Sequence, residues 1–357
     1  MSLSIGIVGL PNVGKSTLFN ALTDAGALAA NYPFATIEPN TGIAPVPDDR
    51  LDILARMYNT TKVVPATVTF VDIAGLVAGA SEGEGLGNKF LANIRECDAI
   101  VQVVRAFEDN DILRHDNTTE ISPLKDIEII QTELMLADIQ TIENHLPKIQ
   151  KELKSNPKVS EKIEYLKSVQ NSLLNGSVPE KFDAELLNEL QLLTAKPVIY
   201  LFNVDEVTLT DTEKQSELSN LIRPAKSIFI CAKLEEELQT LSAEEAVELL
   251  ADYGVNESGL SQLAKTAYST LGLQSYLTAG EKEVRAWTIK QGFTAPQAAG
   301  VIHTDFERGF IAAQIVNYND LISAGSEQAV RAAGKIRTEG KTYTMQPDDV
   351  VEFRFNT

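Results

Sequence analysis

Cysteine and histidine are scarce in this sequence of 357 residues, so two kinds of site are not expected. The two cysteines, Cys97 and Cys231, lie far apart in the chain, and nothing suggests a framework of disulfide bonds. Few cysteines are typical of the reducing cytoplasm, where we expect this protein. The three histidines, His115, His145 and His303, are scattered and lack the spacing of a metal site.

Long apolar runs are also missing. None approaches the roughly 18 residues that a membrane helix requires, so we expect no membrane contact. The start of the chain lacks the basic region and the cleavage site of a signal peptide. Apolar residues make up 44% of the chain, an ordinary share for a globular protein. The length exceeds what one hydrophobic core usually serves and predicts two or three domains.

Basic residues are outnumbered, with 31 Lys and Arg against 50 Asp and Glu, which gives a formal charge of −19. Such a chain does not bind nucleic acid through its overall charge. The imbalance lies in the first 280 residues, because residues 281–357 hold nine Lys and Arg against ten Asp and Glu. The C-terminal part is therefore the better candidate for a contact with RNA.

What the sequence does contain is a phosphate-binding motif. Residues 9–16 read Gly-Leu-Pro-Asn-Val-Gly-Lys-Ser, between an apolar run (Leu3–Val8) and a helical pattern (Lys15–Thr23). The glycines let successive backbone N–H groups face phosphate oxygens, and the positive end of the helix adds to this. Lys15 can reach the β- and γ-phosphates, and the hydroxyl of Ser16 can bind Mg²⁺. The motif predicts a nucleoside triphosphate site.

A second candidate element of the site, which contains an acidic residue, follows the strand pattern Thr67–Val71. Asp72, at the strand end, can hold Mg²⁺ through water, and the N–H of Gly75 can reach the γ-phosphate. Residues 79–87 contain four glycines interrupted by small and acidic residues, which predicts a loop that orders on the γ-phosphate and relaxes after hydrolysis. With Lys15, these residues are the predicted catalytic set.

Two roles stay open on the residues alone. Thr36, within residues 31–40, is a candidate to complete the Mg²⁺ shell or an ordinary loop residue. Asn12 could hold a K⁺ ion near the phosphates or be an ordinary loop residue. Leu76 stands where many GTPases place a glutamine that orients water, and leucine cannot do so. We therefore expect slow turnover that a partner or a cation raises.

The base site departs from the guanine motif. GTPases usually carry Asn-Lys-x-Asp, in which the Asp accepts two hydrogen bonds from guanine. Here Asn203 is kept, Val204 replaces the Lys and Glu206 replaces the Asp, while Asp205 is one residue out of register. Because Glu is one methylene longer than Asp, Glu206 cannot accept the two hydrogen bonds of guanine in the same geometry. The amide of Asn203, in contrast, can pair with adenine. The change predicts a preference for ATP over GTP.

A shorter signal follows the strand pattern Ser227–Ile230. Cys231, Ala232 and Lys233 stand where GTPases have Ser-Ala-Lys, whose backbone contacts the base. Strand patterns separated by helical patterns recur through this part of the chain and predict an α/β domain with a largely parallel sheet.

One long helical interruption lies between the strand patterns. Met135, Ile139, Ile142, Leu146, Ile149 and Leu153 are spaced as a heptad seam, and a second helical pattern follows Pro157. The segment forms either two helices packed on the core or a projecting antiparallel hairpin, and the hairpin is favoured because the α/β pattern resumes only near Pro197.

After about Ser275 the patterns change to those of a small α+β domain. Strands are predicted at Val284–Ile289, Gly309–Val316 and Val350–Phe355, and helices at Ala295–Ala299 and Glu327–Ala333. The predicted domains are 1–122 with 195–275 for the nucleotide, 123–194 for the inserted hairpin, and 280–357 for the C-terminal domain.

Taken together, these motifs closely resemble the Obg-like ATPases, the YchF family, over nearly the whole chain. The resemblance rests on residues 9–16, 31–40 and 72–90 and on the altered base motif. It implies a P-loop domain of GTPase type, an inserted coiled-coil hairpin and a C-terminal TGS domain of ubiquitin-like (β-grasp) fold. It also implies Mg²⁺-dependent hydrolysis of ATP and binding to the ribosome.

The resemblance implies residue roles as well. The phosphates would be bound by Asn12, Val13, Gly14, Lys15, Ser16 and Thr17. Mg²⁺ would be held by Ser16 and Thr36, with Asp72 as predicted above. Val204 would contact adenine through its backbone, and an apolar residue at Leu76 is expected in this family. The base side then comprises Asn203, Val204, Glu206, Cys231 and Ala232.

The expected protein is an ATPase switch: a cytoplasmic monomer that takes ATP and Mg²⁺, with K⁺ as an open addition. Its expected partner is the ribosome, at the large subunit, with RNA contacts through the TGS domain and the hairpin. A basic set, Arg331, Lys335, Arg337 and Lys341, either faces RNA or forms an ordinary solvated face. The alternatives are a GTPase of relaxed base choice and a non-catalytic nucleotide-binding scaffold.

Overall fold

The computed structural model describes residues 3–28, 40–73, 86–109, 121–153, 156, 159–179, 181–183 and 189–356. Its chain forms two compact units, Met1–Ile43 with Thr69–Gln262, and Ala44–Val68 with Leu263–Thr357. None of the helices in the described part of the chain is long and apolar enough to span a bilayer.

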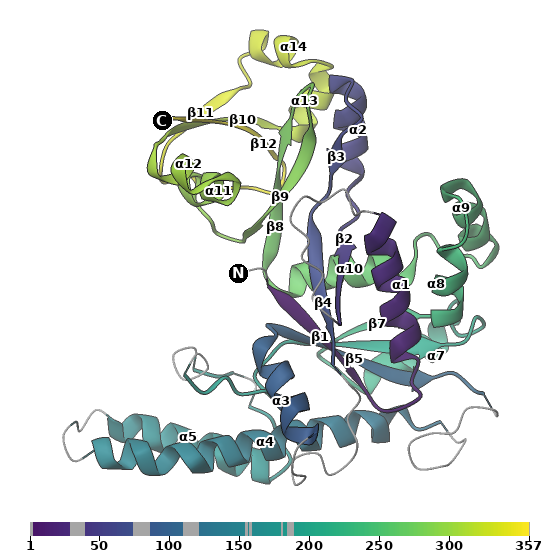
Figure 1. Cartoon of the computed structure of the whole chain (residues 1–357), viewed down its shortest axis with the longest axis vertical. Helices are drawn as coiled ribbons and strands as arrows, with labels where there is room; N and C mark the ends of the chain where they lie inside the picture. The colour runs from purple at the N-terminus through teal and green to yellow at the C-terminus, as the bar shows by residue number, and fades with distance from the viewer. Residues whose placement is uncertain are drawn as a thin grey trace. The chain divides into compact units, whose positions relative to one another are not determined.

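A six-stranded sheet organises the first unit (Figure 1). Its order is β2-β4-β1-β5-β6-β7. The bounds are Thr41–Pro45 for β2, Thr67–Asp72 for β4, Ser4–Gly9 for β1, Ala99–Ala106 for β5, Val198–Val204 for β6 and Lys226–Ile230 for β7. The pairs β1–β4, β1–β5, β5–β6 and β6–β7 are parallel. Their carboxyl ends therefore lie at one edge of the sheet, where the loops that follow them meet.

The central strand shows why this sheet is covered on both faces. All eight residues of β5 are buried, including the polar Gln102 and Arg105. A strand buried on both faces is expected in a parallel sheet, because the helices between its strands pack on either side. Among the helices of this unit, α1 (Lys15–Leu28) packs against β1 and α7 (Thr212–Asn220) against β7. The unit also contains α3 (Leu86–Glu96), α8 (Ala232–Leu238), α9 (Ala243–Asp252) and the first residues of α10 (Gly259–Thr270).

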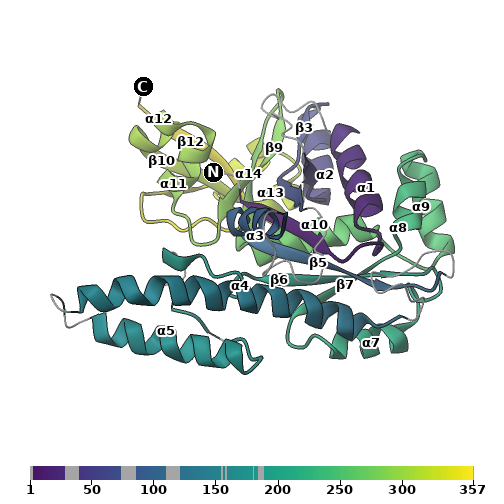
Figure 2. The same ribbon diagram turned by 60° about the horizontal axis from the view of Figure 1, so that its bottom comes forward.

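Two long helices lie side by side in both views (Figures 1 and 2). Helix α4 spans Pro123–Glu152, and α5 spans Val159–Leu174. The heptad residues Ile139, Ile142 and Ile149 of α4 form one buried cluster with residues of α5, among them Leu166. Met135 and Leu146 pack against the same cluster. Five of the six residues of the predicted seam thus contribute to the contact between the two helices, whereas Leu153, just after the end of α4, is exposed.

A buried carboxylate fixes the end of this helical segment to α4. Asp138 has no exposed surface and accepts hydrogen bonds from the backbone N–H groups of Leu193 and Thr194, each at 2.8 Å. The hydroxyl of Thr194 donates a third at 2.7 Å. Leu193 and Thr194 lead into β6, so Asp138 joins the returning chain to the helical segment.

The second unit contains the other sheet, with the order β11-β10-β12-β8-β9-β3. Its strands are β3 (Val63–Val64), β8 (Leu273–Ala279), β9 (Val284–Lys290), β10 (Phe310–Asn317), β11 (Arg337–Glu339) and β12 (Asp349–Phe355). Its helices are α2 (Asp49–Tyr58), α11 (Ala295–Ile302), α12 (Thr304–Arg308), α13 (Tyr318–Ala324) and α14 (Glu327–Ala332). Strands β12 and β8 pair in parallel between two antiparallel pairs, β10–β12 and β8–β9.

The core of this unit lies between the sheet and α11. Ala295, Ala298 and Ala299 of α11 pack against buried Tyr276 and Ile315 of the strands. The unit also holds residues 44–68, which sequence analysis places in the nucleotide domain. The guanidinium of Arg50 in α2 donates to Asp348, at 2.9 Å, and to the carbonyl of Pro347, at 2.7 Å. These bonds are part of the reason that α2 belongs to this unit.

Replacing Asp138 by alanine should destabilise the protein strongly. The change leaves the buried N–H of Leu193 and the partly buried N–H of Thr194 without their acceptor, and we expect the free energy of unfolding to fall by ~3 kcal/mol. Urea denaturation measures the difference. Glu164→Ala, an exposed position on α5, is the matched control and should change stability by less than ~0.5 kcal/mol. Equal effects of the two changes would contradict this role of Asp138.

Candidate nucleotide site

The phosphate-binding loop joins β1 to α1 and depends on backbone conformations that side chains disfavour. Gly14 has a φ of 89° and Asn12 a φ of 64°, both in the left-handed region. A Cβ atom on Gly9 would lie 2.9 Å from Val13 and 3.0 Å from the carbonyl of Val103. A Cβ atom on Gly14 would collide with the side-chain amide of Asn203. The glycines of the motif are therefore required by packing as well as by φ.

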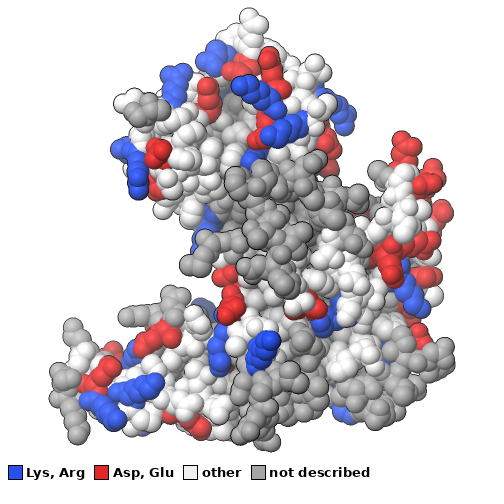
Figure 3. Space-filling view, in the orientation of Figure 1, with Lys and Arg blue, Asp and Glu red and all other residues white. Residues whose placement is uncertain are grey.

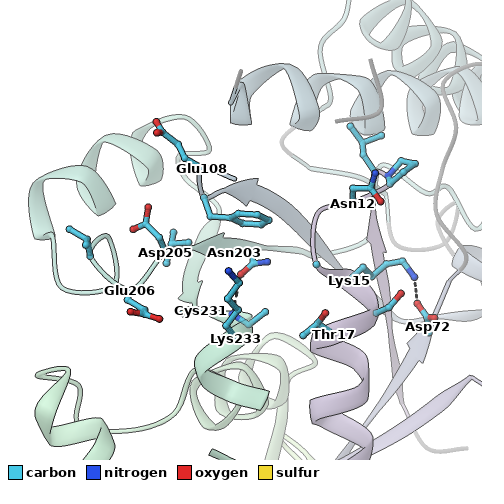
Figure 4. Close-up of a pocket in the computed structure, with 18 residues that line it drawn as sticks. Asn12, Lys15, Thr17, Asp72, Glu108, Asn203, Asp205, Glu206, Cys231 and Lys233 are labelled. Carbon is cyan, nitrogen blue, oxygen red and sulfur yellow. Dashed lines mark hydrogen bonds and ion pairs between the residues drawn. The ribbon is translucent and has the colours of Figure 1, made fainter. Parts of the chain in front are cut away.

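Lys15 and Asp72 form an ion pair within this site (Figure 4). Lys15 is the first residue of α1, and Asp72 is the last residue of β4, the strand beside β1. Their side chains are 11% and 22% exposed. The two residues predicted to act on the phosphates and on the metal thus reach the same point from neighbouring elements.

A cavity of about 930 Å³ extends from this loop along the carboxyl ends of β5 and β6 to the start of α8. Every described residue predicted for the site lines it except Val13, which is 2% exposed and lies beneath the loop. The lining residues that were predicted are Asn12, Gly14, Lys15, Ser16, Thr17, Asp72, Asn203, Val204, Glu206, Cys231 and Ala232. Thr36, Gly75 and Leu76 lie outside the described residues.

The side chain of Asn203, which was predicted to pair with adenine, forms hydrogen bonds with two backbone groups. Its Nδ2 donates to the carbonyl of Val13 at 2.9 Å, and its Oδ1 accepts from the N–H of Ala232 at 3.1 Å. Both ends of the amide are therefore bonded to backbone, and the residue is 5% exposed. Asn203 therefore links the phosphate loop to the residues that follow β7.

The far end of the cavity is lined by Phe107, Glu108 and residues 204–207 and 231–233. Val204 is buried, while Glu206 is exposed to solvent. Asp205 is tied into its own turn, because its carboxylate accepts from the N–H of Thr208 at 2.8 Å. Cys231 is buried, and burial raises the pKa of its thiol. A neutral thiol and a valine suit the edge of an uncharged purine.

Phe107 and Glu108, which follow β5, also line the cavity and were not predicted from the sequence. Arg105 holds this turn: its Nε donates to the carbonyl of Phe107 at 3.3 Å, and its guanidinium lies 4.6 Å from the centre of the Phe107 ring. Arg105 is only 1% exposed although it is always charged. A buried arginine in an apolar strand, just before an aromatic residue, was the available signal.

The donors present at the phosphate end suit Mg²⁺. Ser16 offers a hydroxyl and Asp72 a carboxylate to the same cavity, and Mg²⁺ prefers oxygen ligands supplied partly by one or two side chains and partly by phosphates and water. The described residues contain no cluster of three His, Cys, Asp or Glu that could hold an ion alone. A metal here would therefore depend on the nucleotide.

Comparison with known proteins agrees with this geometry. Residues 4–144 match a family model described as 50S ribosome-binding GTPase, and residues 273–356 match one described as protein of unknown function (DUF933), the C-terminal domain of YchF GTPases. The first match covers β1, β2, β4 and β5 of the first sheet, and the second covers β8 to β12.

Similar proteins cover the chain completely. The sequence is 47% identical to the ribosome-binding ATPase YchF of Bacillus subtilis and 50% identical to that of Haemophilus ducreyi, with 100% of both chains covered in each comparison. The structure of the Schizosaccharomyces pombe YchF GTPase has a TM-score of 0.86 at 41% identity, over 99% of this chain and 98% of that one.

The fold and the cavity define a P-loop nucleotide hydrolase of the GTPase superfamily. Within that class the identities over the full length decide the family. The chain belongs to the YchF family.

Replacing Gly14 by alanine should abolish nucleotide binding. The new methyl group would collide with Asn203 and would also occupy a backbone conformation that alanine disfavours. We expect the Kd for ATP to rise at least about a hundredfold, as measured by isothermal titration calorimetry. Gly280→Ala, where a Cβ would meet nothing within 4 Å, is the control. Binding by Gly14→Ala as tight as that of the control would show that the loop does not contact the phosphates.

Proposed function

We propose that this chain is an Mg²⁺-dependent ATPase that prefers ATP to GTP and acts as a nucleotide-controlled switch on the ribosome. The base preference is inferred from the bonding and the exposure of the two acidic residues that follow β6. A guanine site requires a carboxylate aimed at the N1–H and the exocyclic amine. Here Asp205 is bonded to its own turn, and Glu206 is exposed at the rim.

Adenine needs fewer matched polar partners at this edge. We propose that it lies against Val204 and Phe107, with backbone groups near Cys231 and Ala232 at its other side. A buried polar group that loses its partner costs far more than an apolar contact gains, so guanine would leave its N1–H and amine unsatisfied. Asn203 contributes by holding the two loops in place.

At the phosphate end, each residue has a distinct role in the proposal. Lys15 leaves Asp72 and places its ammonium between the β- and γ-phosphates, where it stabilises the charge that develops on the leaving oxygen. Ser16, Thr36 and, through water, Asp72 would hold Mg²⁺, which would supply further positive charge. Gly75 offers its N–H to the γ-phosphate. With a leucine at position 76, we expect slow intrinsic turnover.

A K⁺ ion beside Asn12 remains part of the proposal. Asn12 lines the cavity in a left-handed conformation and offers a side-chain oxygen to a cation. A hydrolysis rate that is equal in Na⁺ and K⁺ would count against this role.

Binding to the ribosome is proposed from the names of the relatives, which are ribosome-binding ATPases. We propose the large subunit as the site, reached by a monomer through the hairpin (residues 123–194) and the TGS domain (residues 280–357). The basic set of the TGS domain gives limited support. Figure 3 shows Lys and Arg beside Asp and Glu in the C-terminal elements.

Three of the four basic residues have acidic partners. Arg331 pairs with Glu327, Lys335 with Asp320 and Arg337 with Glu339. Lys341 is exposed and forms no ion pair with the part of the chain that the structure describes. An ordinary solvated face therefore accounts for most of this set, and co-sedimentation with ribosomes in ATP, ADP and a non-hydrolysable analogue tests the binding itself.

A GTPase of relaxed base choice is the second candidate. It is favoured by the names of one matching family model and of the Schizosaccharomyces pombe structure, both of which say GTPase. Titration with ATP and GTP separates the two candidates, since the first requires tighter binding of ATP.

Replacing Lys15 by alanine should remove catalysis. The charge next to the transferred phosphate is lost, and we expect phosphate release to fall at least about a hundredfold. A coupled phosphate assay with ATP and with GTP measures both variants. Lys89→Ala, a change outside the cavity lining, serves as the control. If Lys15→Ala releases phosphate as fast as the control, the measured hydrolysis does not come from the P-loop, and the scaffold alternative is not excluded.

A further inference from the structure

The first turn of α8, which forms part of the cavity wall, belongs to a short helix. Helix α8 has seven residues, and its N-cap residue Cys231 makes no side-chain capping hydrogen bond. A helix this short is not stable without tertiary contacts. The position of Cys231 and Ala232 at the cavity must therefore be set by bonds to other elements.

One such bond comes from Asn203, described above, and a second comes from within α8. Glu235, one turn after Cys231, is 2% exposed. Its Oε1 accepts from the N–H of Gly259 at 2.6 Å, and its Oε2 accepts from the N–H of Leu260 at 3.4 Å. Gly259 and Leu260 are the first residues of α10, and the N–H of the next residue, Ser261, is capped by Ser258 at 3.1 Å.

The carboxylate of Glu235, a residue of α8, therefore caps the N-terminus of another helix, α10. The first N–H groups of a helix have no partner inside it, and the positive end of the helix favours an anion. Gly259 allows the close approach, because a Cβ there would lie 2.5 Å from Ile230 and 3.1 Å from the Oε1 of Glu235. Ile230 is the last residue of β7, directly before Cys231.

We infer that Glu235 is a positioning residue for the base end of the nucleotide cavity: by capping α10 it fixes the loop of Cys231 and Ala232. The inference rests on the proposed nucleotide site. Asn203 holds Ala232 toward the phosphate loop, and Glu235 holds the next turn of α8 against α10. The first turn of α8, between these two attachments, is then held in place where the purine is proposed to bind.

A small cavity beside Glu235 shows that it has no cationic partner there. The cavity, about 130 Å³, is lined by apolar and amide side chains, and Glu257 is the other ionisable residue among them. Burial raises the pKa of Glu235 to about 7, while the two backbone N–H groups oppose this shift. Because its ordinary value is 4.5, the folded protein keeps this proton to a higher pH than the unfolded chain does.

The pH dependence follows from that difference. As the pH rises from about 4.5 to about 7, the unfolded chain loses the proton freely and the folded protein does not, so Glu235 lowers the free energy of unfolding over this window. Glu235→Gln removes the titration and keeps an acceptor for Gly259. The stability of this variant relative to the wild type should rise between those pH values, as measured by urea denaturation at several pH values. Parallel curves would show that the folded protein does not keep the Glu235 proton to a higher pH than the unfolded chain does.

The functional test measures kcat, KM and the Kd for ATP. Glu235→Ala should raise Kd and KM about tenfold, the effect of losing hydrogen bonds to a charged group, with kcat changed less than about twofold. Glu235→Gln should recover most of the affinity. Gly259→Ala, which displaces the start of α10 from the other side, should raise Kd as Glu235→Ala does. Glu236→Ala, an exposed neighbour on α8, is the control and should match the wild type.

The outcomes separate this inference from the proposed function. If the wild type itself binds no ATP, the nucleotide proposal fails and this inference fails with it. Binding of ATP by the wild type, with loss of hydrolysis in Lys15→Ala, would uphold the proposed function. If Glu235→Ala and Gly259→Ala then bind ATP as tightly as Glu236→Ala, only the inference is overturned. Should Glu235→Ala fail to fold, Gly259→Ala and Glu235→Gln decide the question alone.

Discussion

The two hydrogen bonds of the Asn203 side chain are the interaction on which the site depends. They connect loops that follow different strands and that are 190 and 29 residues away from Asn203 in the chain. Because β1, β6 and β7 are parallel members of one sheet, their following loops start at the same edge. The amide then fixes the distance between the phosphate loop and the loop of Cys231, and with it the space for a nucleotide.

A second consequence concerns the choice of side chains around this amide. Gly14 cannot carry a Cβ because Asn203 occupies that space, and the left-handed φ of Gly14 is itself readily adopted only by glycine. A sequence motif that is usually explained by phosphate contacts is therefore also a packing constraint between two loops. The same reasoning applies to Gly259, whose missing side chain lets α10 approach β7 and Glu235.

Much of the fold could be predicted because its signals are local. The apolar runs at β1, β4, β5, β6 and β7 and the heptad seam of α4 are read from spacing alone, and the phosphate motif marks the start of α1. Strand β8 and helix α2 carry no comparable signal, since β8 mixes apolar and polar residues and α2 is recognised as part of the second unit only through contacts distant in sequence, such as that of Arg50 with Asp348.

The site shows the same division. Lys15, Ser16 and Asp72 could be predicted because each belongs to a motif with fixed spacing. The bonding of Asn203, the wall made by Phe107 and the cap supplied by Glu235 depend on which backbone groups the fold brings within reach, and no spacing encodes that. The pairing of the Asn203 amide with adenine stays a prediction, and the two bonds that the amide makes to backbone groups of Val13 and Ala232 could not be read from the sequence.

Hydrogen exchange of backbone amides with and without Mg·ATP tests the central claim most directly, namely that one nucleotide occupies the space between the two loops. If ATP binds as described, amides of residues 10–17 and of residues 231–235 should both exchange more slowly in the presence of millimolar Mg·ATP. Unchanged exchange in both segments at that concentration would contradict the account.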